Sequence, residues 1–411
     1  MPDTPSDTAT HEILIFGAGN IGRSFVGQIF GRAGYATVFA DVDGALVHAL
    51  TRDGTYTVVH RHPDGHEERL TVPHVSAVRA DDPTAVNAVL RRVRLVATSV
   101  GAAVLPKILP LLAEEAVRRY THGQAPFDLI LAENIHGGGE MARQAILAQF
   151  PTDSSHVHYK GSVPCGGAPG VIECSVGKMV PIIPEALRRR EPTTVYAEAF
   201  NTLLVDAKGW SGPLPEVTQI RAVQPIQAWV ERKLYIHNLG HAASAYLGHL
   251  YVPHLTSIAE VISEASVHQE VRTAMETAGV ALQYEYPGVF SDHDITGHIE
   301  DLLYRFASPT LGDTVFRVGR DIRRKLGAHD RIAGALHLLR RHNLPTAPLE
   351  RVYRAALHFR ARDEAGNLYP ADEQFHNELQ SHPDPTTYIA ELSDFDPRTD
   401  RPLLNRLVEN R

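Results

Sequence analysis

The sequence has little of several residue types that mark particular classes of protein. Only two cysteines occur among its 411 residues, which argues against a disulfide framework and favours a reducing, cytoplasmic compartment. It has no run of about 18 uncharged apolar residues, so we expect no transmembrane helix. Basic residues are not in excess, since 40 Lys and Arg stand against 48 Asp and Glu. The resulting net charge of −8 argues against nucleic acid or an anionic membrane as a partner.

What the sequence does contain is typical of a globular enzyme. Hydrophobic residues make up 43% and charged residues 21% of the chain, enough apolar content for a sizeable core. The length predicts two domains. Residues 1–11 are polar and acidic, without the basic and apolar regions of a signal peptide, and we expect them to form a disordered leader.

The first half of the chain alternates short apolar runs with helical patterns. Such alternation is typical of a parallel sheet covered on both faces, so we predict an α/β domain of the Rossmann type over residues 12–210. A different pattern at 55–72 alternates polar and apolar residues around Pro-Asp-Gly and predicts a β-hairpin. The predicted strands of the main sheet include residues 12–16, 36–41, 95–100 and 129–134, and a further strand pattern covers 193–206.

The second half has a different character. Residues 208–217 are rich in Gly and Pro and form the best candidate for a linker. Beyond them, long segments with helical periodicity and few strand patterns predict a mostly α-helical domain over residues 217–411. The sequence leaves open whether the protein is a monomer or a homodimer.

A glycine-rich turn follows the first predicted strand. The spacing Gly17-x-Gly19-x-x-Gly22 permits a tight turn, a close approach of a pyrophosphate to the backbone, and packing of helix on strand. Asp41 ends the second strand, where an acid accepts hydrogen bonds from ribose hydroxyls and repels a 2′-phosphate. We therefore predict NAD as the cofactor. The other predicted cofactor-binding residues are Asn20, Ile21, Val100 and Gly101.

A second group of residues suits the chemistry of an alcohol. Lys233, Asn238 and His241 fall on one predicted helix, and at about 100° per residue all three can face one broad cleft. A desolvated lysine can act as base, and an asparagine amide can donate to a developing alkoxide. Asn134, at the end of a predicted strand, would reach the same oxygen. His237 and His241, with His249 and His254 nearby, could instead form a zinc site, but no cysteine and no HExxH motif accompany them.

Together these residues resemble the long-chain, zinc-independent mannitol and polyol dehydrogenase family. The resemblance implies NAD-dependent hydride transfer without a metal, with Lys233 as catalytic base, Asn134 and Asn238 as an oxyanion-hole-like pair, and His241 orienting the substrate. We expect the active site to lie between the two domains. The blocks that carry the resemblance are residues 15–27, 39–43, 98–105, 132–138, 231–248 and 317–332.

One motif departs from the family pattern. The family's common Val-Asp-Arg signature appears here as Val176-Gly177-Lys178, so an acid that contacts polyol hydroxyls in other branches is missing. The departure weakens the case for a plain polyol as substrate more than it weakens the case for the chemistry.

A basic segment points to the class of substrate. Residues 317–325 hold five basic side chains against one acid, and this local excess is unusual in a protein of net charge −8. Arginine forks and a lysine suit the capture of a phosphate dianion, although a solvated helix face would show the same excess. The segment resembles that of the family branch with phosphorylated substrates. The predicted substrate-binding residues are Arg317, Arg320, Arg324, Lys325 and Arg331.

The resemblance implies a specific reaction, the interconversion of D-mannitol 1-phosphate and D-fructose 6-phosphate. Three alternatives stay open at this point. One is a dehydrogenase of an unphosphorylated polyol, or a hexuronate reductase, of the same family. The others are a dinucleotide-sensing protein without turnover and a zinc enzyme.

Overall fold

The computed structural model describes residues 11–133, 135, 137–181 and 185–409. The chain folds into two compact units, one of residues 1–62 and 66–227 and the other of residues 63–65 and 228–411. The leader expected at residues 1–11 lies, except for His11, outside the described residues. Among the described residues, no helix is long and apolar enough to cross a membrane.

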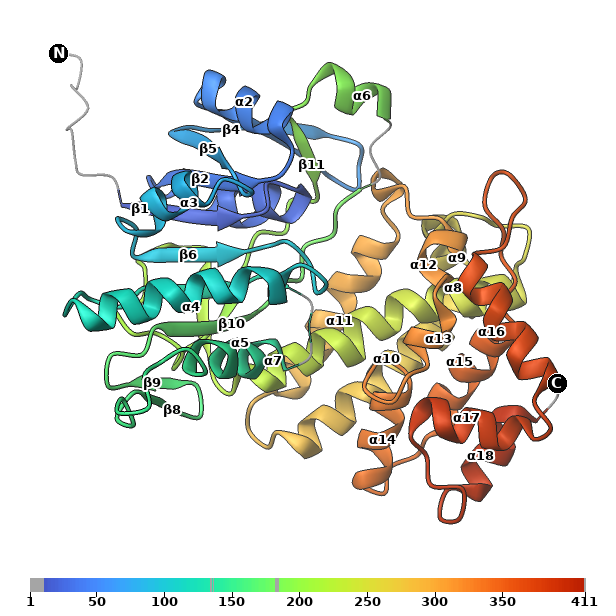
Figure 1. Cartoon of the computed structure of the whole chain (residues 1–411). Helices are drawn as coiled ribbons and strands as arrows, with labels where there is room; N and C mark the ends of the chain where they lie inside the picture. The colour runs from blue at the N-terminus through green and yellow to red at the C-terminus, as the bar shows by residue number, and fades with distance from the viewer. Residues whose placement is uncertain (1–10, 134, 136, 182–184, 410–411) are drawn as a thin grey trace. The chain divides into compact units, whose positions relative to one another are not determined.

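The first unit is built on an eight-stranded sheet in which only the pairing of β10 with β12 is antiparallel. Several of its strands, among them β1, β2, β5, β6 and β10, are labelled in Figure 1. The runs predicted at 12–16 and 36–41 form β1 and β2, and the other two predicted strands form β6 and β7. In order across the sheet, the strands are β13 (Ile220–Val223), β12 (Leu203–Asp206), β10 (Gly170–Ser175), β7 (Asp128–Leu131), β6 (Leu95–Thr98), β1 (Glu12–Phe16), β2 (Ala36–Asp41) and β5 (Val75–Arg79).

Helices cover both faces of this sheet, which is why its central strands are apolar on both sides. A π-helix, η1 (Gly22–Gly27), continues into α1 (Gln28–Arg32), and both pack with α2 (Gly44–Asp53) on one face. The other face is covered by α3 (Pro83–Leu90), α4 (Leu105–Thr121) and α5 (Gly138–Leu147). The α/β architecture predicted for this part of the chain is confirmed.

The hairpin predicted at 55–72 is also confirmed. β3 (Tyr56–Arg61) and β4 (Glu67–Val72) pair antiparallel, and β11 (Val195–Ala197) adds to them in parallel. A short helix, α6 (Glu185–Arg190), precedes β11, and β8 (His158–Lys160) pairs with β9 (Val163–Cys165) elsewhere in the unit.

The second unit is helical, and among its described residues strand-like pairing is limited to one bridge between Ser257 and Thr314. Its longest helix is α10 (Ala265–Glu285), which packs against α8 (Leu239–Tyr251), α11 (Asp292–Phe306), α14 (Ala333–Arg341) and α15 (Ala347–Leu357). α7 (Ile226–Arg232) leads into the unit. Its other helices are η2 (Lys233–Asn238), α9 (Ile258–Ser263), η3 (Pro309–Leu311), α12 (Val315–Gly319), α13 (Ile322–Lys325), α16 (Pro370–Ser381), α17 (Pro385–Ser393) and α18 (Arg401–Val408).

The structure differs from the predicted organisation in two places. The strand pattern at 193–206 divides into β11 and β12, which belong to different sheets. The Gly- and Pro-rich segment 208–217 is followed by β13, which pairs in parallel with β12, so the large sheet extends beyond the predicted linker. β13 escapes prediction because it has only four residues and closely follows the Gly- and Pro-rich segment.

Candidate active site

The glycine-rich turn after β1 is shaped by close backbone contacts. Gly17 has φ +92°, a conformation that side chains rarely adopt, and its N–H donates to the Ala40 carbonyl at 2.8 Å. A Cβ at Gly22 would collide with the carbonyl oxygen of Gly17. At Gly19, by contrast, a Cβ would meet nothing within 4 Å. The first and third glycines therefore permit the turn, and the second leaves its backbone open to a ligand.

Asp41 links this turn to the end of β2. One carboxylate oxygen accepts the Ala18 N–H at 2.6 Å and the other accepts the Asp43 N–H at 2.9 Å. Carboxylate oxygens have further lone pairs, so Asp41 can still accept hydrogen bonds from a ribose.

Part of the turn and Asp41 line a cavity of about 570 Å³ in the first unit, a volume typical of ligand sites. Of the predicted cofactor residues, Gly19, Asn20 and Asp41 line it. Gly17, Ile21, Gly22, Val100 and Gly101 do not line it. Open backbone at the turn and a carboxylate at the end of β2 fit a dinucleotide with its pyrophosphate on the turn and its ribose near Asp41.

Arg23 lines the same cavity, although sequence reasoning missed it. Its Nε donates to the Ala18 carbonyl at 2.6 Å and one Nη donates to the Pro192 carbonyl at 3.1 Å. Burial lowers the pKa of this guanidinium to about 10, partly offset by Tyr56, Asp41 and Asp43. A buried cation so close to the turn supplies positive charge where phosphates would bind.

The ends of β6 and β7 are joined by a buried carboxylate that the sequence analysis did not single out. Glu133 accepts the Thr98 hydroxyl at 2.7 Å and the Val100 N–H at 3.0 Å. Burial raises the pKa of Glu133, although hydrogen bonds from Thr98 and the backbone oppose the shift. Asn134, the predicted oxyanion ligand next to it, lies outside the described residues.

In the second unit, the predicted Lys233–Asn238 segment forms a π-helix rather than an α-helix. An α-helix would place these two side chains about 140° apart. A π-helix closes its hydrogen bonds from residue i to residue i+5, so positions five apart lie closer to one face. The chain returns to α geometry in α8, where a Cβ at Gly240 would collide with Met275 of α10. Gly240 thus serves helix packing.

His241, on α8, is held from two sides. Its ring stacks on Phe306, with centroids 5.0 Å apart and planes 16° from parallel. Its Nε2 lies 3.0 Å from a carboxylate oxygen of Asp313, an acid that sequence reasoning missed. The other oxygen of Asp313 pairs with the guanidinium of Arg317.

All five predicted basic residues converge on the same place. Arg317, Arg320, Arg324, Lys325 and Arg331 line a cavity of about 370 Å³. Its remaining lining residues are His241, Val318, Asp321 and Tyr369.

The chain forms this cavity by a break between two short helices. Asp321 adopts φ +69°, between α12 and α13, and the Asp372 carboxylate caps the break by accepting the N–H groups of Asp321 and Ile322. The neighbouring residues Arg323 and Arg324 of α13 contact different parts of the unit. Arg324 pairs with Asp321 and Asp330, whereas Arg323 pairs with Glu378.

Two cations of this cavity have lowered pKa values. Burial, followed by the charges of Arg331 and Arg324, lowers the pKa of Lys325 to about 7, while Asp321 and Asp372 oppose the shift. Its ammonium donates to the carbonyls of Val318 and Arg320. Burial and neighbouring Arg320 also lower the pKa of Arg317. Cations held out of water gain strongly from a bound anion.

The residue that departs from the family signature belongs to the first unit. Lys178 is buried, its ammonium 3.3 Å from the Gln28 amide oxygen and 3.4 Å from that of Asn201. Gln28 also contacts His60, whose pKa falls to about 4, mainly because of burial and next because of Lys178. This departure therefore places a cation in a buried polar cluster.

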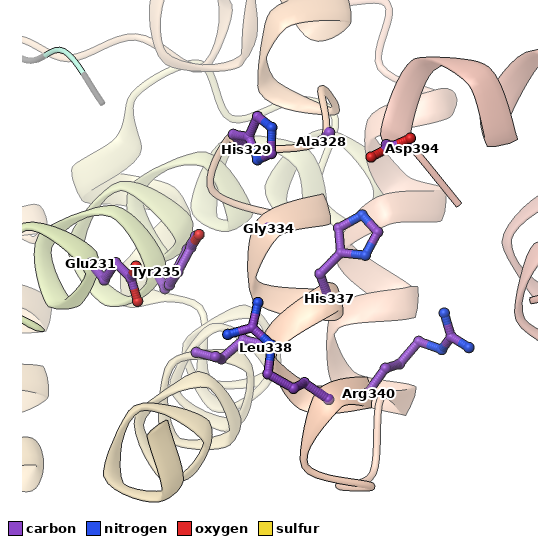
Figure 2. Close-up of a pocket in the computed structure, with 10 residues that line it drawn as sticks. Glu231, Tyr235, Ala328, His329, Gly334, His337, Leu338, Arg340 and Asp394 are labelled. Atoms are coloured by element: carbon purple, nitrogen blue, oxygen red, sulfur yellow. The ribbon is translucent and has the colours of Figure 1, made fainter. Parts of the chain in front are cut away.

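A further cavity of the second unit contains none of the predicted site residues. It measures about 470 Å³ and is bordered by Glu231 and Tyr235 on one side and by His329, His337 and Asp394 on the other (Figure 2).

The histidines considered for a zinc site are not gathered around one point. His249 accepts the Arg360 N–H at 3.1 Å. Over the described part of the chain, no three His, Cys, Asp or Glu side chains gather as metal ligands would.

Family models match both parts of the chain. The Rossmann domain of mannitol dehydrogenase matches residues 11–219, and the C-terminal domain of mannitol dehydrogenase matches residues 225–409.

Solved structures with a similar fold include two polyol dehydrogenases. One is a substrate-free D-sorbitol dehydrogenase, with a TM-score of 0.72 at 16% identity. The other is mannitol 2-dehydrogenase from Pseudomonas fluorescens in a ternary complex with NAD and D-mannitol, with a TM-score of 0.67 at 15% identity. Each match covers 97% of this chain and 94% of the other. The two family models together span nearly the whole chain, which therefore belongs to the mannitol dehydrogenase family of oxidoreductases.

Proposed function

We propose that the protein is an NAD-dependent mannitol-1-phosphate 5-dehydrogenase, which interconverts D-mannitol 1-phosphate and D-fructose 6-phosphate. The observation that carries the proposal is the cavity beside His241, which is lined by five basic side chains. A hexitol has no charge for five cations to bind, whereas a phosphate monoester carries close to two negative charges at neutral pH.

The cofactor assignment rests on the first unit. The open backbone at Gly19, the cation of Arg23 and the carboxylate of Asp41 fit a dinucleotide without a 2′-phosphate. The similar mannitol 2-dehydrogenase is in a complex with NAD. When bound, NAD supplies the hydride acceptor, and NADH the donor, at the carbinol carbon.

The chain's own residues handle the proton and the oxygen. In the proposal, Lys233 takes the hydroxyl proton during oxidation and returns it during reduction. The amide of Asn238 donates to the oxygen as its charge develops. Asn134 is proposed to donate to the same oxygen, and His241 to orient the substrate through a hydroxyl.

The proposal is tested by NADH oxidation with fructose 6-phosphate and with fructose, side by side, and then with NADPH in place of NADH. We expect a kcat/KM for the phosphorylated ketose at least about a hundredfold higher, since the phosphate alone engages the basic cavity. Equal or reversed preference would reject the phosphate and favour the alternative, an unphosphorylated polyol dehydrogenase or a hexuronate reductase.

Cofactor choice should depend on Asp41. Asp41→Asn keeps an acceptor for the Ala18 N–H but removes the charge that repels a 2′-phosphate. We expect the preference for NADH over NADPH to fall by about tenfold or more, measured as the ratio of kcat/KM values. Asp53→Asn serves as control, because Asp53 pairs with Arg52 at the surface and does not line the cofactor cavity. An unchanged ratio in Asp41→Asn would remove this residue from cofactor selection.

Substrate binding should weaken above neutral pH because of Lys325. The pKa of its ammonium is lowered to about 7, so the cavity loses one positive charge as the pH rises from 6 to 8.5. Phosphate monoesters are mostly dianionic above a pKa of about 6, so titration of the substrate would act in the opposite direction. We expect KM for fructose 6-phosphate to rise several-fold across this range in the wild type, and in Lys325→Met to be high at pH 6 and not to rise with pH. A parallel rise in both proteins would assign the pH dependence to another group.

A further inference from the structure

A single carboxylate connects two residues of the substrate cavity. One oxygen of Asp313 lies 3.0 Å from Nε2 of His241, and the other pairs with the guanidinium of Arg317. The Asp313 side chain is only 9% exposed, compared with 21% for His241 and 39% for Arg317. Asp313 therefore lies behind the two side chains that face the cavity.

The backbone fixes the position of this carboxylate. The Asp313 carbonyl accepts the Ile258 N–H at 2.9 Å, and the next residue, Thr314, pairs with Ser257. The Val315 N–H donates to the Thr256 carbonyl at 2.8 Å. Since hydrogen bonds on both sides tie the segment to the start of α9, Asp313 is held in place independently of His241.

Apart from Asp313, the surroundings of His241 are one aromatic ring and charged groups that are mostly cationic. Phe306 of α11 covers one face of the ring. Lys233 and His237 lie on the same continuous helix as His241, and Arg305 lies on α11 near His237. The remaining titratable residues that share the cavity with His241 are Arg317, Arg320, Asp321, Arg324, Lys325, Arg331 and Tyr369.

The contact with Asp313 restricts which tautomer the His241 imidazole adopts. An ionised carboxylate only accepts hydrogen bonds, so the neutral ring carries its proton on Nε2 and has its lone pair on Nδ1. Without the acid, both tautomers would be available.

We propose that Asp313 is a positioning residue, which fixes His241 in its Nε2–H tautomer and holds Arg317 beside it. Both side chains then meet the substrate in one arrangement, His241 at a hydroxyl and Arg317 at the anionic part. The inference rests on the proposed function, because it assumes that these two residues contact the substrate.

The substitution Asp313→Asn changes the side chain little in shape and separates the two roles of Asp313, which are fixing the tautomer of His241 and holding Arg317. Arg317 is always a donor, so the amide oxygen of the variant should turn to Arg317 and the amide NH₂ to His241. Nε2 of His241 must then accept, and the ring proton moves to Nδ1. The expected result is the opposite tautomer with Arg317 still held.

Two measurements test the proposal. Nitrogen NMR with histidine-selective labelling reports which ring nitrogen carries the proton, and the signals lost in His241→Asn provide the assignment. Steady-state kinetics should show kcat/KM lowered by about 10- to 100-fold in Asp313→Asn. In the His241→Asn background, Asp313→Asn should lower kcat/KM by less than about threefold, since His241, the residue through which Asp313 acts, is gone.

Glu300→Gln is the matched control. Glu300 is an exposed residue of α11 that pairs with Arg272 of α10, and we expect the Gln variant to keep wild-type kinetics and the wild-type tautomer. If Asp313→Asn retains the Nε2–H tautomer, or if its kinetic effect persists in full without His241, the positioning role is wrong. The NMR result does not require turnover, so it decides the role of Asp313 even if fructose 6-phosphate is not a substrate.

Discussion

Replacing Lys233 by alanine should lower kcat by roughly a hundred- to ten-thousand-fold while NADH still binds. The expected loss is that of a general base, because in the variant no amine takes the proton from the carbinol hydroxyl. NADH affinity should persist because the glycine-rich turn and Asp41 belong to the first unit, whereas Lys233 lies on η2 of the second. Stopped-flow kinetics and a fluorescence titration with NADH would measure the two effects separately.

Lys107→Ala is the control for this experiment. Lys107 is an exposed lysine on α4, and its removal should change neither kcat nor NADH affinity. Added small amines should partly restore turnover to Lys233→Ala, since they can enter the space left by the side chain. A variant with near wild-type turnover would rule out Lys233 as the base.

The second large effect is expected from Arg324→Ala. A charge-assisted hydrogen bond to a phosphate contributes about 1.5–3 kcal/mol, and each 1.4 kcal/mol is about tenfold in affinity. KM for fructose 6-phosphate should therefore rise by about 10- to 100-fold. Turnover of fructose, which has no phosphate, should stay unchanged if it is measurable.

The neighbouring residue provides a control with the same side chain. Arg323 lies outside the cavity and pairs instead with Glu378 and Tyr388. Arg323→Ala removes an equal charge from the same short helix, so a purely long-range effect would appear in both variants. An equal rise of KM in both would mean that net charge, rather than contact, accounts for the effect.

The fold was largely predictable from the sequence because its strongest signals are local. Apolar runs such as residues 12–16 and 36–41 become central strands, and Pro63-Asp64-Gly65 turns the hairpin. β13 was not predicted because it follows a Gly- and Pro-rich segment and has only four residues.

The candidate site was predictable only in part. The arginines and lysine of 317–331 form a dense local pattern, and the structure brings all of them except Arg323 to one cavity with His241. Asp313 shows no such pattern, since it lies 72 residues beyond His241 and is a single acid near a turn. Glu133 likewise becomes conspicuous only when the ends of β6 and β7 are adjacent. Contacts of this kind depend on tertiary structure.

The π-helix between Lys233 and Asn238 has a consequence for how this region tolerates change. One additional residue within a helical turn separates this geometry from a regular α-helix. With the present spacing, a change to α geometry would turn Lys233 and Asn238 about 140° apart, whereas removing one residue would leave them four apart and only about 40° from each other in an α-helix. The match between helix type and spacing is therefore as much a requirement of the site as the identity of its side chains, and point substitutions alone would not reveal it. A scan of this segment by single-residue deletion and insertion would reveal that requirement.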